Sequence, residues 1–150
     1  MVVGSSSIAN MLLVEPRGIR NNNPLNIRRG QNWQGLRPLQ TDPQFCQFVS
    51  MEYGCRAAIK LLRNYITGFG GKRKPCRNLH DIIHPWAPSS ENDTDSYILR
   101  VGIDTGLHPF ESIDPNDRKT IVSLVAAMAK VECGQPIDKN LIASAYDLLS

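Results

Sequence analysis

Two long segments of the chain repeat their apolar residues at helical spacing, and this pattern restricts the fold more than any other feature. Residues 53–66 form one apolar stripe, made by Cys55, Ala58, Ile59, Leu62, Tyr65 and Ile66. Residues 116–133 form another, made by Ile121, Leu124, Val125, Met128 and Val131. Each segment is followed by glycine, at Gly68 and Gly134, and glycine favours the backbone that closes a helix. The pattern predicts two amphipathic helices packed on a common core.

Shorter helices are predicted from their capping residues. Asn78 with Asp81 resembles a capping box, and Pro85 is expected to stop that helix at His84. Asn92 and Asp95 can cap a helix over 93–104. Asp138 can cap a last helix that reaches Leu149.

The early part of the chain has a different composition. Residues 15–50 are rich in Asn, Gln, Pro, Gly and Arg, and apolar patches at 25–28 and 45–49 predict two short strands joined by a polar loop. The predicted class is therefore α+β, mainly α, with a small early β-hairpin. Residues 15–150 are expected to form a single domain, preceded by a loosely attached arm, 1–14, with one helical turn at 8–14.

The Asn-rich segment, residues 17–28 (RGIRNNNPLNIR), is the least ordinary part of the sequence. Asn21, Asn22 and Asn23 offer paired donors and acceptors, and Pro24 biases Asn23 toward extended backbone. Such amides can bind a polyhydroxy or amide-bearing ligand. They can equally bond the backbone of their own loop, and the residue types alone favour this structural role.

Five motifs together resemble those of small phage and prophage proteins of the virion-associated, lysozyme-like type. They are RGIRNNNPLNIR, Trp33-Gln34-Gly35, FCQF, YGCRAAIKLLRNY and WAPSSENDTDSY, and the resemblance covers 17–106. The order of these features is also similar to that of bacterial glucosaminidases with a lysozyme-like fold. The resemblance implies a lysozyme-like helical domain with a saccharide groove between the early strands and the helices.

The activity that the resemblance implies is hydrolysis of peptidoglycan glycan strands, of the muramidase or glucosaminidase class. Such cleavage needs a carboxylic acid to protonate the leaving oxygen. The candidates are Glu15, where lysozyme-like folds place the acid, Glu52 at the start of the 53–66 helix, and Glu91 in the 86–93 loop. Glu15 lacks a long helix before it, so the alternative is a catalytically silent virion or prophage protein that binds the cell wall.

The same resemblance implies a set of substrate-binding residues. These are Asn21, Asn22, Asn23, Asn26, Trp33, Arg56, Trp86, Asn92, Thr94 and Tyr97. The two tryptophans could stack on sugar faces, although burial is the commoner role of tryptophan. Arg56, in the first turn of its helix, is favoured as a structural residue.

Other chemistries have weaker support. His80 and His84 are spaced for one metal ion, but no third ligand is evident, so no metal or cofactor is expected. Cys55 with His84 or His108 would make a thiol nucleophile, yet Cys55 lies on an apolar stripe. The four cysteines form no CxxC pair and are expected to be free.

Charge and hydropathy limit the partners. The net charge of +3 favours anionic surfaces, but the basic loop 72–77 has no interleaved aromatic residues, so nucleic acid is not the expected partner. No apolar run approaches the ~20 residues of a membrane span, and the start is a poor signal peptide. The expected partners are cell-wall glycan and other virion proteins, reached after synthesis in a bacterial cytoplasm.

Overall fold

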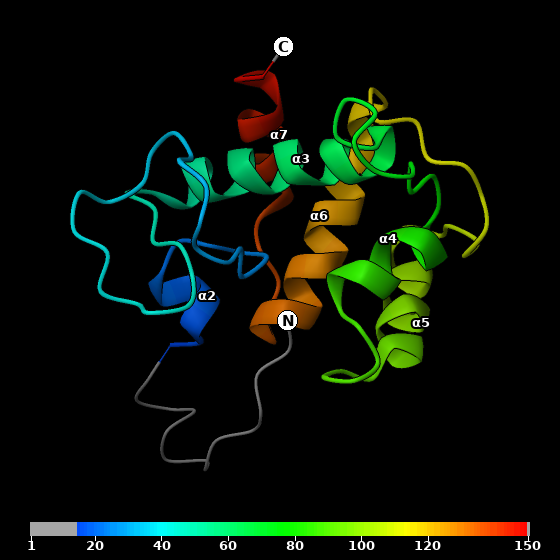
Figure 1. Ribbon diagram of the computed structural model, residues 1–150, viewed down its shortest axis with the longest axis horizontal. Coiled ribbons are helices and arrows are strands. Elements are labelled where there is room, and N and C mark those ends of the chain that lie inside the picture. Colours follow the sequence, from blue (N-terminus) through cyan, green and yellow to red (C-terminus); the bar gives the residue numbers. More distant parts are fainter. Residues whose placement is uncertain (1–14, 150) are drawn as a thin grey trace.

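The computed structural model describes residues 15–149, so the predicted arm 1–14 and its helical turn lie outside the described residues. Within this span the chain is mainly helical (Figure 1). The helices are α2 (Arg17–Arg20), α3 (Met51–Thr67), α4 (Leu79–Trp86), α5 (Thr94–Thr105), α6 (Arg118–Cys133) and α7 (Lys139–Asp147). None of the helices in the described span is long and apolar enough to cross a membrane.

Helix α6 lies at the centre of the core. It packs against α2, α3, α5 and α7, and Leu124, Val125 and Met128 are fully buried. Figure 1 shows α3 crossing over α6, with α4 and α5 on one side and the segment after α2 on the other. The two predicted long helices are therefore confirmed, as α3 and α6.

Side-chain caps fix most of the helix starts. Ser50, Asn78, Asp117 and Asp138 each accept a hydrogen bond from a backbone N–H of the following first turn. The cap of α5 is Asp93, whose side chain accepts from Ser96 N at 3.1 Å. The prediction of Asn92 or Asp95 as its cap was wrong.

The prediction that α4 stops at His84 was also wrong, because the helix runs through Pro85 to Trp86. Proline removes a backbone donor, but Ala87 N still donates to Ile83 O at 2.7 Å and closes the last turn. Trp86 is therefore the last residue of α4 rather than the first residue of the loop that follows.

The predicted β-hairpin is absent from the described residues. Residues 21–50, here named the loop region, contain only two isolated antiparallel bridges, Arg28–Phe45 and Leu36–Phe48. Scattered backbone hydrogen bonds cross this region, such as the bond that Cys46 N donates to Ile27 O at 2.9 Å. Polar side chains add to them: Gln40 Nε2 donates to Gln47 O at 2.7 Å, and Gln47 N donates to Gln40 Oε1 at 2.8 Å. These backbone bonds and side-chain amides together satisfy the backbone of the region without an extended ladder.

Candidate functional site

Asn23 holds the Asn-rich segment together. Its side chain is fully buried, and its Nδ2 donates to Ile27 O at 2.9 Å and to Cys46 O at 3.0 Å. Its Oδ1 accepts from Ile27 N at 2.8 Å. Both ends of this amide therefore bond the backbone of the loop region, as the structural alternative for Asn21–Asn23 requires.

Asn21 belongs to a buried polar network centred on Asp42. Arg17 donates to Asp42 through Nε at 2.7 Å and Nη2 at 2.6 Å, and Asn21 Nδ2 donates at 2.9 Å. The backbone N–H groups of Gln44 and Phe45 also donate to this carboxylate. The Arg17 guanidinium, followed by these other donors, holds the pKa of Asp42 well below its usual range.

Asn22 joins the loop region to α3. It adopts a positive φ of 52°, and its Nδ2 donates to Phe48 O at 3.1 Å. The backbone of α3 approaches so closely here that a Cβ on Gly54 would lie 1.8 Å from Asn22 O. Only glycine at this point of α3 permits the contact.

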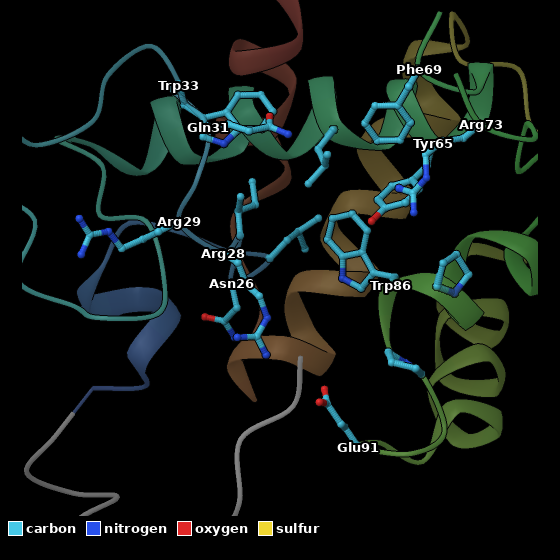
Figure 2. A pocket seen from close by; sticks show the side chains of 15 residues that line it. Asn26, Arg28, Arg29, Gln31, Trp33, Tyr65, Phe69, Arg73, Trp86 and Glu91 are labelled. Atoms are coloured by element: carbon cyan, nitrogen blue, oxygen red, sulfur yellow. The ribbon is translucent and has the colours of Figure 1, made fainter. Parts of the chain in front are cut away.

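Above this scaffold lies a groove of about 430 Å³, formed by two walls. Figure 2 shows the first wall, which includes Asn26, Arg28, Arg29 and Trp33 from the loop region, facing a second wall from α3, α4 and the loop that follows α4. We name this feature the groove. Its lining residues are Leu25, Asn26, Ile27, Arg28, Arg29, Gln31, Trp33, Leu61, Tyr65, Phe69, Arg73, Pro85, Trp86, Pro88 and Glu91.

Aromatic rings line the second wall. Tyr65 packs edge-on against both Phe69 and Trp86, with ring centroids 5.3 Å apart in each pair. The guanidinium of Arg73 lies over the rings of Tyr65 and Phe69. Rings next to cationic groups suit a ligand that combines an apolar face with anionic substituents.

The three candidate acids occupy different places. Glu91 lines the groove (Figure 2). Glu15 is exposed just before α2, and Glu52 lies half-buried in the first turn of α3. Neither Glu15 nor Glu52 lines the groove.

The predicted binding residues are likewise divided. Asn26, Trp33 and Trp86 line the groove, whereas Arg56 lines a separate hollow beside the end of α7. Trp33 is almost fully buried, and its indole N–H has no acceptor among the described residues. The first wall therefore holds Trp33 by packing rather than by a hydrogen bond.

Two other predicted binding residues support the second wall from behind. Thr94 is buried, and its hydroxyl donates to Ala87 O at 2.6 Å. Asn92 Nδ2 donates to Pro88 O at 3.3 Å. Both bonds fix the loop that presents Glu91.

Tyr97, the last predicted binding residue, contacts a buried acid that the sequence analysis did not select. Its hydroxyl donates to Oε2 of Glu132, which is 5% exposed, at 3.0 Å. Glu132 continues the buried stripe of Ile121, Val125 and Met128 at helical spacing, and a carboxylate in such a stripe was the available signal. The groove residues Tyr65, Phe69 and Arg73 were also missed, because they converge only through the turn that ends α3.

The alternative chemistries receive no built site among the described residues. Burial raises the pKa of Cys55 to about 12, so this thiol is a poor nucleophile. The ring of His80 lies 4.4 Å from that of His84, between centroids, and its Nδ1 contacts Asp81. Within residues 15–149, no group of three or more His, Cys, Asp or Glu side chains is arranged to hold a metal ion.

Within residues 15–149 the protein is mainly helical, and the groove lies on its surface between the loop region and the helices. No family model matches the chain. It is 38% identical over 122 residues to Protein P5 of Pseudoalteromonas phage PM2, a match that covers 79% of this chain and 71% of that protein. The chain belongs to the same bacteriophage protein family as Protein P5.

Proposed function

We propose that this phage-type protein binds and hydrolyses the glycan strands of bacterial peptidoglycan, with the groove as its saccharide site. The observation that carries the proposal is convergence. Asn26 and Trp33 lie far in sequence from Trp86 and Glu91, and these four residues, which the sequence predicts as binding or catalytic residues, line one groove. The relationship to a bacteriophage protein supports a phage origin, and a wall-degrading phage protein would act in entry or lysis.

Glu91 is the acid that this arrangement favours. In the proposed reaction its carboxylic acid protonates the glycosidic oxygen, the bond to the sugar's anomeric carbon breaks, and water then adds to that carbon. The substrate's own acetamido group would stabilise the cationic intermediate, and the added water would give up a proton to the Glu91 carboxylate. Trp86 would support a sugar face, and Arg28, Arg29 and Arg73 would favour strands that carry carboxylates.

One observation favours a second function, binding without cleavage. Glu91 is exposed, and among the described residues it is the one Asp or Glu that lines the groove. A catalytically silent virion protein could keep the same groove to attach the phage to the cell wall.

Clearing of purified cell walls, followed with the release of reducing ends, tests the enzyme. We expect Glu91→Gln to lower the rate by about 100-fold or more, as loss of a general acid does. Glu15→Gln and Glu52→Gln should lose far less, and Glu111→Gln, an exposed acid away from the groove, serves as the matched control. Wall binding without cleavage on several wall types would support the silent protein instead. A protein that neither binds nor cleaves any of the walls would contradict both proposed functions.

A further inference from the structure

Glu132 is a buried carboxylate at the end of α6 that lies directly behind the first wall of the groove. Its Oε1 accepts from Asn26 Nδ2 at 3.3 Å, and its Oε2 accepts from the Tyr97 hydroxyl at 3.0 Å. The two donors come from segments far from Glu132 in sequence, one in the loop region and one in α5. An ionised carboxylate only accepts hydrogen bonds, so it fixes both neighbours as donors.

Tyr97 is locked in the donor role. It is 2% exposed, and burial, followed by the neighbouring charge of Glu132, raises its pKa well above the usual range. The phenol therefore stays protonated and donates its hydrogen bond to Oε2 of Glu132. The other oxygen faces the amide of Asn26.

Asn26 is the member of this cluster that reaches the groove. Its backbone has a positive φ of 50°, so the wall turns sharply at this residue. Its Oδ1 points toward Gly18, where a Cβ would lie 3.0 Å from that oxygen and 2.7 Å from Cys133 Sγ. The amide is thus confined between α2 and Glu132, and Ile27 and Arg28 extend the wall from it.

We propose that Glu132 is a positioning residue of the groove, which holds Asn26 in one amide orientation and so fixes the wall that contacts the glycan. The inference rests on the proposed function for the identity of the ligand. A neutral side chain of equal size fills the same space but no longer dictates which end of the Asn26 amide faces it. The charge, rather than the volume, of Glu132 is what the groove requires.

Glu132→Gln is the direct test, because its amide can still accept from one neighbour and donate to the Tyr97 oxygen. We expect an unfolding midpoint close to that of the wild type, and binding of solubilised peptidoglycan glycan strands weakened by about 10-fold, the worth of one charge-assisted hydrogen bond. Tyr97→Phe should lose more stability than Glu132→Gln but less binding. A purely structural role predicts that binding loss follows stability loss in both variants, and that result would overturn the proposal.

A double-mutant cycle tests whether Glu132 acts through Asn26. Asn26→Gly tolerates the positive φ, and we expect Glu132→Gln to weaken binding no further in that background. Additive losses, or unchanged binding in Glu132→Gln alone, contradict the inference. If the wild type binds no glycan, the proposed function is refuted, but the positioning role of Glu132 can still be tested. The NMR signals of the Asn26 side-chain amide then decide the positioning role, since Glu132→Gln must shift them and unchanged signals would refute it.

Discussion

The loop region and the helices α3–α7 are stabilised by different kinds of interaction. The helices pack apolar stripes, such as that of Leu124 and Met128, around α6. The loop region has few backbone bridges and is held by side chains that bond backbone, with Asn23 and Asp42 at its centre. The comparison shows that one wall of the groove is built by polar networks, while the other is carried on helices.

This difference explains what the sequence could predict. Apolar periodicity and end-capping located the helices because both signals are local. The polar network was not predictable from local sequence, because Asn21 and Asp42 are far apart in the chain and come into contact only in the folded loop region. Asn21–Asn23, which the resemblance implied as ligand-binding residues, are bonded mainly within the loop region. Glu132, which the sequence analysis did not single out, is buried.

The largest effect should come from the contact between the two regions. Gly54→Ala places a Cβ 1.8 Å from Asn22 O, so α3 and the loop region must separate. We expect a loss of about 3 kcal/mol in the free energy of unfolding, measured by urea denaturation. Gly102→Ala is the control: its Cβ would lie 3.2 Å from Leu107 O, a contact that a small shift relieves. Equal losses in the two variants would show that the close approach at Gly54 is unimportant.

The next effect tests whether the polar network carries the loop region. Asp42→Asn leaves Arg17 without its carboxylate partner, and we expect a loss of about 2 kcal/mol, because Asp42 is buried while Arg17 is partly exposed. The matched control is Asp147→Asn, which breaks a similar bidentate pair with Arg118 on the exposed surface. Solvent screening should make that loss far smaller. Comparable losses would remove the distinction between the buried network and a surface ion pair.

A smaller effect should appear in acid. Because the pKa of Asp42 is lowered in the folded state, its ionised form stabilises the protein at neutral pH. That contribution is complete above the unfolded pKa of about 4 and is lost as pH falls toward the folded pKa. The free energy of unfolding should therefore drop below about pH 4 in the wild type and drop less steeply in Asp42→Asn. Parallel pH curves for the two proteins would mean that another group sets the acid sensitivity.

NMR signals of the two tryptophans test most directly the central claim, that the groove between these two regions binds cell-wall glycan. The chain has two, Trp33 on the loop-region wall and Trp86 on the helical wall, and both line the groove. Their indole N–H signals give one NMR probe for each wall. Titration with solubilised peptidoglycan glycan strands should shift both signals and saturate them together. Binding that leaves both signals unmoved would place the glycan elsewhere and contradict the account.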